Sequence, residues 1–281
     1  MQYTLPKAYL SASALNCLLT CPRQYQFRYI EKIPVPPSAA MLTGTALHKT
    51  FEQYYRGIIE NPANRLSSSQ TADLAMTAFE DTVTSEENYL TCTEREQASA
   101  TVRELASAYV ETVGKGIVPL AVEEQYQYTS RCGVPLLAFI DLRRQCPDGS
   151  EMICDYKIMT KKWTMDKLAN SLQFNLYAMI TGNGDTEIHN IVKVQPSKRP
   201  AALKRTDDLF DLSPNLRVLR FSFDGGAFNH LENLIESAAQ LITSGIFMPC
   251  ALDAWNCTPE WCGYWNLCRG KPQAKAFDMA A

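Results

Sequence analysis

Two segments of this chain decide its fold: Leu136-Leu137-Ala138-Phe139-Ile140-Asp141 and, after a short connection, Glu151-Met152-Ile153-Cys154-Asp155-Tyr156-Lys157. Both are rich in strand-forming residues, and Asp148-Gly149 in the connection is a turn signal, so together they predict a β-hairpin. Residues two apart on a strand face the same side, so Asp155 and Lys157 share a face and the hairpin brings Asp141 beside them. Two carboxylates near a lysine suit a hard divalent cation and a polarised water molecule.

The residues around the hairpin predict helices and strands around one small sheet. Ser11-Ala12-Ser13 is suited to cap a helix, because a serine oxygen can accept a backbone N–H that the first turn leaves unpaired. Apolar residues at helical spacing dominate before residue 115, and strand-like runs begin at Ala121. The expected helices are Ala14–Tyr29, Thr43–Ile59, 71–90, 94–113, Asp166–Ile180 and Asp224–Ile246, and the expected strands are Val122–Tyr128, Val134–Arg143, Glu151–Ile158, Glu187–Val194 and Leu216–Phe223. This order predicts an α+β or α/β fold.

Length, composition and charge narrow the class of protein. With 281 residues, 46% of them apolar, the chain can bury a substantial core. The formal net charge of −3 disfavours a protein that coats DNA, although basic groups can still be local. The chain has no G-x4-G-K-[ST] loop and therefore no helicase motor of that kind. It also lacks an export signal and a long apolar span, so we expect a soluble protein of a reducing, cytoplasmic compartment.

Three more side chains complete the candidate site. His48 follows Gly44 at the start of a helix, and an imidazole can bind a divalent metal. Gln173 and Tyr177 are four residues apart and therefore lie on one face of the helix after the hairpin. Taken singly, each of these residues is more often structural. Glu123 and Glu124 on the preceding strand are further candidates for the acidic shell, although neither is favoured.

The ordered set of residues is more specific than any member. His48, Asp141, Asp155-Tyr156-Lys157 and Gln173-x3-Tyr177 resemble the RecB-like branch of the PD-(D/E)xK nuclease superfamily. The opening Cys21-Pro22-Arg23-Gln24-Tyr25 resembles the N-terminal signature of that branch, so the resemblance extends from about residue 9 to residue 268. One departure is Ala138, where the family often has glycine.

This resemblance implies a fold and a division of roles. The fold would be a restriction-endonuclease-like α/β core, a small mixed sheet flanked by helices, with a helical N-terminal elaboration. His48, Asp141, Asp155 and the carbonyl of Tyr156 would bind Mg²⁺ or Mn²⁺. Lys157 would activate or position the attacking water. Gln173 and Tyr177 would organise the site and the DNA backbone.

Cys257, Cys262 and Cys268 form a C-x4-C-x5-C pattern near the end of the sequence. Three thiolates at this spacing suit a soft metal centre, and a fourth is needed for a tetrahedral site or a cubane cluster. Zinc more often uses paired C-x2-C knuckles, which are absent here, so an iron–sulfur cluster is favoured over zinc or reduced core cysteines. The aromatic residues expected to shield this centre from water are Trp255, Trp261, Tyr264 and Trp265.

Some members of the same nuclease branch hold a [4Fe–4S] cluster with one early and three late cysteines. They include CRISPR-associated RecB-like exonucleases and AddB-type nuclease domains. The resemblance implies that Cys21 joins Cys257, Cys262 and Cys268, with Cys17 and Cys250 as the rivals. The cluster would then pin the C-terminal tail to the N-terminal helix and close the DNA-binding groove.

Basic residues beside aromatic ones are the candidate DNA contacts. Arg23 and Arg28 lie near the early cysteine, and Lys161-Lys162-Trp163 follows the hairpin. Positive charge with an adjacent aromatic ring suits phosphate contact and base stacking, although a solvated loop is the alternative reading. Lys198-Arg199 and Lys204-Arg205 add basic character to a later loop.

We therefore expect one nuclease domain over residues 1–281. It would comprise a mainly helical part over 1–115, a nuclease core over 120–247 and a cysteine tail over 248–270 that closes onto Cys21. The expected activity is hydrolysis of DNA by a metal-activated water, as an exonuclease on single-stranded ends. A structure-specific endonuclease and an inactive module that binds DNA or a helicase stay open. The expected partners are DNA and a helicase, recombination or CRISPR-adaptation protein.

Overall fold

The chain folds around a six-stranded mixed sheet. The structure is a computed structural model that describes residues 5, 7–85, 90–193 and 204–269. Its longer helices are α1 (Ala12–Thr20), α3 (Ala39–Glu60), α4 (Ser68–Ser85), α5 (Cys92–Thr112), α7 (Leu172–Thr181) and α8 (Phe228–Ser244). Short helical segments are α2 (Pro22–Tyr25), α6 (Met165–Ala169), α9 (Trp265–Arg269), the π-helical Gln26–Ile30 and the 3-10 turns Pro62–Asn64 and Gly114–Gly116. The strands are β1 (Val118–Thr129), β2 (Pro135–Gln145), β3 (Glu151–Met159), β4 (Asp185–Val192), β5 (Leu209–Ser213) and β6 (Leu216–Ser222).

The sheet has the order β1-β2-β3-β4-β6-β5. All neighbouring strands are antiparallel except β3 and β4, which run parallel and are joined through α6 and α7. The predicted β2–β3 hairpin is confirmed, with Gly149 at φ 87°, a left-handed conformation that glycine adopts without strain. The expected α/β fold with a small mixed sheet flanked by helices is likewise confirmed.

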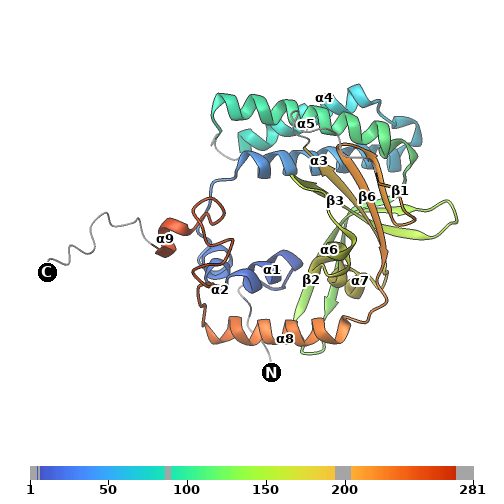
Figure 1. Cartoon of the computed structure of the whole chain (residues 1–281). Coiled ribbons are helices and arrows are strands. Elements are labelled where there is room, and N and C mark those ends of the chain that lie inside the picture. Colours follow the sequence, from blue (N-terminus) through green and yellow to red (C-terminus); the bar gives the residue numbers. More distant parts are fainter. Residues whose placement is uncertain (1–4, 6, 86–89, 194–203, 270–281) are drawn as a thin grey trace.

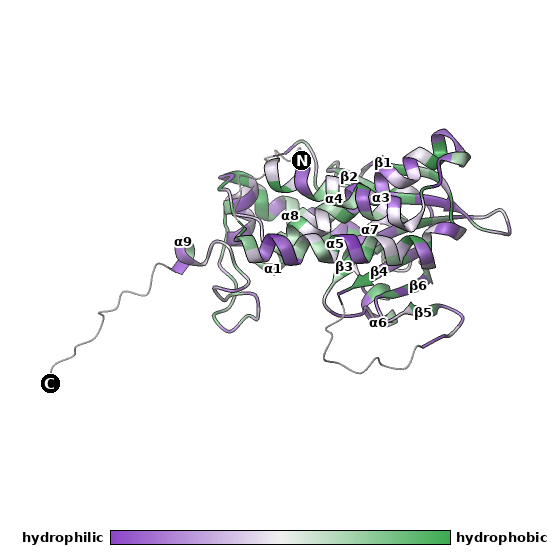
Figure 2. Cartoon of the chain, turned by 90° about the horizontal axis from the view of Figure 1, so that it is seen from above, coloured by the Kyte–Doolittle hydropathy of each residue, from purple (hydrophilic) through white to green (hydrophobic). Residues whose placement is uncertain are grey.

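Helices cover the sheet in separate groups (Figure 1). One core lies between α3, α4, α5 and the sheet and includes Phe51, Phe79, Tyr109 and Tyr156. A second core joins α1, α7 and α8 to the start of β2, through residues such as Leu15, Leu136 and Ile235. Along these helices hydrophobic and hydrophilic residues alternate, as Figure 2 shows, which fits elements that bury one face and expose the other.

Several helix boundaries differ from the expectation for physical reasons. The helix expected over Ala14–Tyr29 breaks at Cys21, whose backbone is extended (φ −161°, ψ 105°). Proline disfavours the helical conformation of the residue before it, so Pro22 ends α1 and begins α2. The Ser11 cap is confirmed, since its side chain accepts the N–H of Ala14. Helix α3 begins at Ala39, where Ser38 caps it, four residues before the expected start.

Other boundaries were also missed. The expected helix Asp166–Ile180 is two helices, because the chain turns at Asn170 and Ser171. Strand β5 was not expected, because it is a short edge strand held by pairing with β6. The expected helix 71–90 ends at Ser85 in the structure, and residues 86–89 lie outside the described part. Among the residues described, no helix combines the length and the apolar character needed to cross a bilayer.

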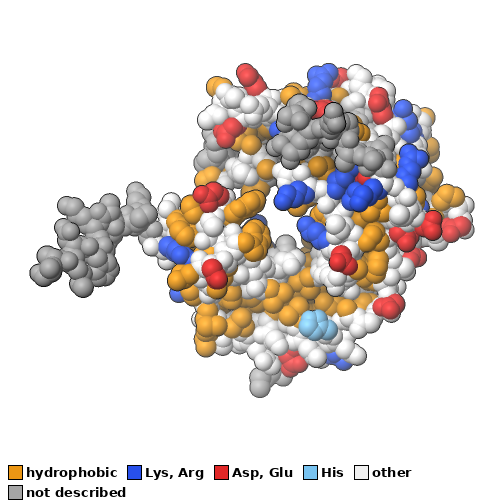
Figure 3. Space-filling model, in the orientation of Figure 1, with side chains coloured by type: hydrophobic (Ala, Val, Ile, Leu, Met, Phe, Trp, Pro, Cys, Tyr) orange, Lys and Arg blue, Asp and Glu red, His pale blue; other side chains and the backbone are white. Residues whose placement is uncertain are grey.

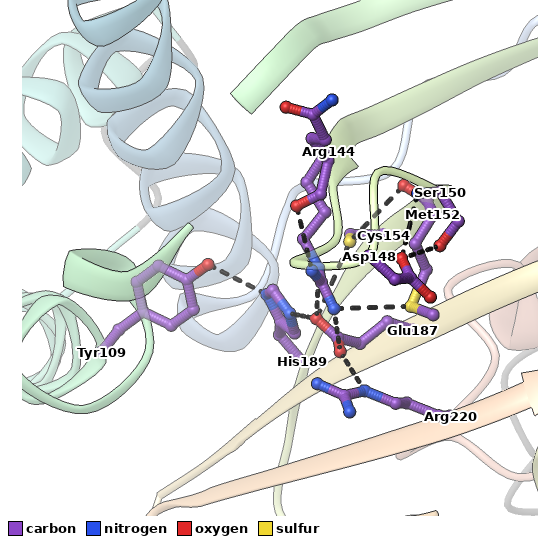
Figure 4. A network of polar contacts seen from close by, with 10 residues as sticks. Tyr109, Arg144, Asp148, Ser150, Met152, Cys154, Glu187, His189 and Arg220 are labelled. Carbon is purple, nitrogen blue, oxygen red and sulfur yellow. Dashed lines mark hydrogen bonds and ion pairs between the residues drawn. The ribbon is translucent and has the colours of Figure 1, made fainter. Parts of the chain in front are cut away.

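A buried polar network ties the centre of the sheet to α5 (Figure 4). The carboxylate of Glu187 on β4 accepts hydrogen bonds from Arg144 on β2 (2.7 and 3.0 Å) and from Arg220 on β6 (2.6 Å). His189 Nε2 lies 2.7 Å from Glu187 Oε1, and its Nδ1 lies 2.9 Å from the Tyr109 hydroxyl. Because each buried charge has several partners, the network holds β2, β4 and β6 in register beneath the helices.

Candidate active site

The candidate site lies where β2 and β3 separate. The two strands pair from Gln145↔Glu151 to Leu142↔Cys154, after which β2 continues beside β1 and β3 beside β4. Asp141 is the first residue of β2 beyond this paired segment. Its Oδ2 accepts the backbone N–H of Tyr156 at 2.9 Å, which satisfies a donor that the separating strand leaves unpaired.

Asp155 and Lys157 occupy the same face of β3 and meet α7. Lys157 Nζ lies 2.6 Å from Asp155 Oδ1 and donates a hydrogen bond to Gln173 Oε1 at 2.9 Å. Gln173 Nε2 in turn donates to Asp155 Oδ2 at 2.9 Å and to the Tyr177 hydroxyl at 2.7 Å. The carboxylate, the ammonium and the amide thus form a closed triangle, and Gln173 fixes the orientation of the other two groups.

The buried Asp155 Oδ1 has no well-directed hydrogen bond, although the Lys157 ammonium is close to it. The short distance gives Coulomb attraction, but the angles do not meet hydrogen-bond geometry. A buried carboxylate oxygen without a directed donor has room for a further positive partner. This oxygen is therefore a candidate metal ligand.

His48 on α3 and Glu123 on β1 face Asp141 from the other side. One ligand atom of each of these three residues lies within 4.8 Å of the others, close enough to share one metal ion. Val122 pairs with Leu142 and Glu124 with Ile140, which places Glu123 opposite Asp141. His48 Nδ1 is 3.4 Å from Asp141 Oδ2.

The sequence offers both Glu123 and Glu124 as further acidic candidates and favours neither. Its backbone has a φ of 49°, a left-handed conformation that is uncommon for glutamate and that redirects the side chain. Glu124 instead pairs with Arg143, whose Nε donates to it at 2.8 Å.

Tyr156 separates the site from the core beneath it. Its ring packs on Phe51 and Tyr109 on the helical face of the sheet, with ring centroids 4.9 and 5.8 Å apart. The edge contact between the rings of His48 and Tyr156 (5.5 Å) orients the imidazole toward the carboxylates.

Burial and mutual charge set the protonation of the site. Burial, and then the nearby Asp141 carboxylate, raise the pKa of Asp155 to about 6, although Lys157 opposes this shift. Burial and the carboxylates of Asp141 and Glu52 raise the pKa of Glu123 to about 7. Burial alone would lower the pKa of His48, but Asp141 outweighs it and the pKa is raised. Neighbouring acids cannot all ionise without a compensating positive charge. This cluster therefore favours a bound cation.

Two cavities open from these residues. One, of about 530 Å³, is lined by residues that include His48, Glu123 and Lys157. The other, of about 480 Å³, runs along α1 and includes Gln173 and Tyr177 in its lining. Gln173 lines the second cavity and accepts a hydrogen bond from Lys157, which lines the first. Figure 3 shows a hollow through the middle of the molecule, with Lys and Arg side chains gathered beside it.

A separate cavity of about 300 Å³ is lined by five cysteines: Cys21, Cys250, Cys257, Cys262 and Cys268. Cys17 is not among its lining residues and instead faces the cavity along α1. Burial and hydrogen bonds with Cys257 and Cys21 raise the pKa of the Cys250 thiol to about 12. The structure therefore brings the early cysteine Cys21 and the three late cysteines together, with Cys250 beside them.

The chain closes on itself at this cavity. Tyr264 donates a hydrogen bond to the carbonyl of Ile33 at 3.0 Å, and Arg23 N donates to the carbonyl of Met248 at 3.1 Å. Tyr264 and Trp265 line the cavity as expected, together with Phe27.

Some expected contacts are wrong. Trp255 and Trp261 are exposed and pack on each other rather than shielding the cysteines. Trp163 is buried against Phe174, so it cannot stack on a base. The adjacent Lys162 is held by Asp211 at 2.8 Å. Lys198 and Arg199 lie outside the described residues.

Comparisons with known proteins bear on the whole chain. The family model described as the PD-(D/E)XK nuclease superfamily matches residues 9–269. Thirteen chains of solved structures also match. One of them, titled "Crystal structure of SSO0001", has a TM-score of 0.39 and 11% identity, and the match covers 94% of this chain and 88% of that chain. No curated protein matches.

Proposed function

This chain belongs to the PD-(D/E)XK nuclease superfamily, and on that premise we propose that it is a divalent-metal-dependent exonuclease acting on single-stranded DNA ends. The observation that carries the proposal is the joining of both carboxylates and the lysine at the fork of β2 and β3. Asp141, Asp155 and Lys157 come from two strands, and Gln173 holds the last two in place.

The donor set fits a hard divalent cation. His48, Glu123 and Asp141 offer one nitrogen and two carboxylate oxygens within 4.8 Å, and Asp155 adds a buried oxygen without a directed hydrogen bond. Mg²⁺ and Mn²⁺ prefer oxygen ligands, and Mn²⁺ also accepts an imidazole. We propose His48, Asp141, Asp155 and the Tyr156 carbonyl as the metal ligands, together with Glu123, whose carboxylate lies within 4.8 Å of the ligand atoms of His48 and Asp141. A bound cation would supply the positive charge that polarises the scissile phosphate and lowers the pKa of water.

The side chains around this set have distinct roles in the proposed reaction. Lys157 places its ammonium beside Asp155, where it can orient the attacking water and stabilise negative charge that develops on the phosphate. Gln173 keeps Lys157 and Asp155 at their mutual distance. Tyr177 supports Gln173 from one helical turn away on α7. Asp141 ties the site to the backbone through the N–H of Tyr156.

The preference for single strands is supported by the shape of the site. His48 and Glu123 line one of two open cavities, Gln173 lines the other, and the cysteine tail closes the ring of elements around the hollow in Figure 3. A flexible single strand can bend into such a space, whereas a rigid duplex cannot. The Lys and Arg side chains beside the hollow favour binding of a polyanion such as a DNA strand. We also propose that a helicase, recombination or CRISPR-adaptation partner supplies these strands, as the resemblance to RecB-like nucleases implies.

We further propose a [4Fe–4S] cluster on Cys21, Cys257, Cys262 and Cys268. A tetrahedral zinc site brings its thiolate sulfurs within about 4 Å of one another, since each Zn–S bond is about 2.3 Å. Among the described residues, no three of these sulfurs lie within 4.8 Å of one another. A cubane binds its thiolates at separate corners, so the wider spacing and the cavity of about 300 Å³ fit it better. The cluster would fasten the tail to α2.

The test is digestion of end-labelled single-stranded, duplex and circular DNA by anaerobically purified protein with Mg²⁺, Mn²⁺ or EDTA. Wild type is compared with Asp155→Asn and with Asp185→Asn, a control carboxylate exposed at the start of β4. We expect metal-dependent loss of linear single strands by wild type and the control only. Cutting of circles would show an endonuclease. DNA binding without cleavage, by protein that carries its cluster and binds Mn²⁺, would show a binding module instead.

A further inference from the structure

The cavity along α1 has the features of a substrate groove and is not explained by the candidate catalytic residues. We call it the α1 groove; its key residues are Asn16, Thr20, Arg28, Phe139, Gln173 and Tyr177. Its volume is about 480 Å³. Gln173 and Tyr177 belong to both the groove and the candidate active site, so the groove leads directly to the carboxylates.

Phe139 lies on the β2 side of the groove. It is 46% exposed, although its neighbours Ala138 and Ile140 on the same strand are buried. It lies two residues before Asp141, so its ring is close to the catalytic fork. Its ring packs on no other aromatic ring among the described residues. A flat apolar ring open to a groove beside a phosphodiesterase site is suited to stack on a base.

Polar groups form the opposite wall. Asn16 and Thr20 are exposed on one face of α1, together with Ser13 one turn earlier. Arg28 is exposed and forms no ion pair among the described residues; its guanidinium lies over the Tyr29 ring at 5.6 Å. The Asn16 amide and the Arg28 guanidinium suit the phosphates of a nucleic-acid backbone, which are contacted mainly by such groups, whereas the Thr20 hydroxyl already donates to the Asn16 carbonyl at 2.6 Å.

Hydrogen bonds fasten the two walls of the groove to each other at one end. Leu10 N donates to the carbonyl of Pro135, and Leu137 N donates to the carbonyl of Leu10, both at 2.9 Å. These bonds fasten the segment before α1 to the start of β2, and the buried face of α1 packs on α7 and α8. Because backbone bonds hold the segment before α1 on β2, the two walls of the groove keep their spacing at that end.

We propose that the α1 groove holds the single DNA strand next to the scissile phosphate, with Phe139 stacked on one base and Arg28 and the α1 side chains on the phosphates. This inference rests on the proposed nuclease function and adds a binding site for the strand. Stacking is tolerant of sequence because every base has a flat face, so Phe139 would bind the strand without sequence specificity.

The test is fluorescence anisotropy with a fluorescein-labelled oligothymidine and Mg²⁺, with every protein carrying Asp155→Asn to prevent cleavage. Phe139→Ala should raise the Kd about 5-fold to 100-fold, and Phe139→Trp should keep the affinity. Leu19→Ala, which removes a 53% exposed residue of α1 outside the groove lining, should leave the Kd unchanged. Both Phe139 variants should keep the parent melting temperature, because the ring is only partly buried.

A second set of oligonucleotides locates the stacked base. One abasic residue is moved along the strand, and the Kd is measured for the parent and for Phe139→Ala. At one position of the abasic residue, the parent should bind the strand more weakly than it binds the intact strand. Phe139→Ala should not show this loss of affinity, because it lacks the ring that stacks on the missing base.

The outcomes separate this inference from the proposed function. If wild type cleaves single strands but Phe139→Ala binds like the parent, or the abasic loss persists in the variant, the stacking site is refuted and the nuclease stands. If the parent binds no DNA and wild type cleaves none, the proposed function fails and the groove assignment fails with it. Tighter binding of an extended peptide than of oligothymidine would also overturn the assignment.

Discussion

Glu187→Gln should strongly destabilise the protein although it changes only one atom of one side chain. Glu187 lies in the centre of the sheet, 3% exposed, and balances Arg144, which is 8% exposed. Removing one partner of a buried ion pair leaves the other charge uncompensated, which costs about 3–5 kcal/mol. Arg220 adds a further bond, but it is 43% exposed and water screens much of its contribution.

This free energy converts into a measurable melting shift. For a domain of this size, 1 kcal/mol corresponds to about 2–4 °C, so the melting temperature should fall by about 6–20 °C. The effect has a defined pH dependence. Burial would raise the pKa of Glu187, but hydrogen bonds from His189 and Arg144 hold it well below the ordinary value of 4.5. Its stabilisation is therefore complete above about pH 4.5 and is lost as the pH falls further, so the wild-type advantage should narrow in acid.

The assay is calorimetric unfolding of wild type, Glu187→Gln and the control Glu151→Gln. Glu151 also pairs with an arginine, at 2.7 Å, but its side chain is 48% exposed. The control should change the free energy of unfolding by less than about 0.5 kcal/mol. The reasoning is refuted if Glu187→Gln melts within about 2 °C of wild type at neutral pH, or if both variants shift equally.

Three further predictions concern the candidate sites. Gln173→Ala should lower kcat about 10-fold to 100-fold in initial-rate assays, because Lys157 and Asp155 lose their common hydrogen-bond partner; an unchanged kcat would contradict its positioning role. Titration calorimetry should show Mn²⁺ affinity rising with pH up to about 7, because Glu123 must lose its proton to bind metal. In Glu123→Gln that rise should be shallower, and a pH-independent affinity in wild type would count against the ligand assignment. Cys262→Ser should abolish the visible absorbance of an iron–sulfur cluster in anaerobically purified protein, whereas Cys132→Ser, outside the cysteine cavity, should keep it; equal absorbance in both would contradict the cluster assignment.

The proximity of the candidate residues could be predicted because it depends on short-range geometry. Alternation along a strand puts Asp155 and Lys157 on one face, and a tight turn returns the chain from Asp141 to them. Helical spacing likewise puts Gln173 and Tyr177 on one face. The match of the family model to residues 9–269 agrees with the extent of the resemblance that these residues carry. Their chemical roles remain predictions.

Features set by tertiary packing or unusual backbone could not be predicted. Choosing Glu123 over Glu124 requires the left-handed backbone at Glu123, which no residue type at that position announces. Trp163 looked available for stacking, but the position of α7 buries it. Trp255 and Trp261 adjoin the cysteines in sequence, yet the turns of the tail direct them outward.

The closure between the two ends of the chain has a consequence for how the protein is made. The apolar face of α1 packs on α8, and Tyr264 bonds to Ile33 across 231 residues of sequence. During synthesis the N-terminal residues leave the ribosome first, long before their partners exist. Part of the apolar face of α1, which includes Leu15 and Leu18, therefore stays uncovered until α8 has been synthesised. We expect the nascent chain to be most prone to aggregation when translation stalls before residue 228, where α8 begins.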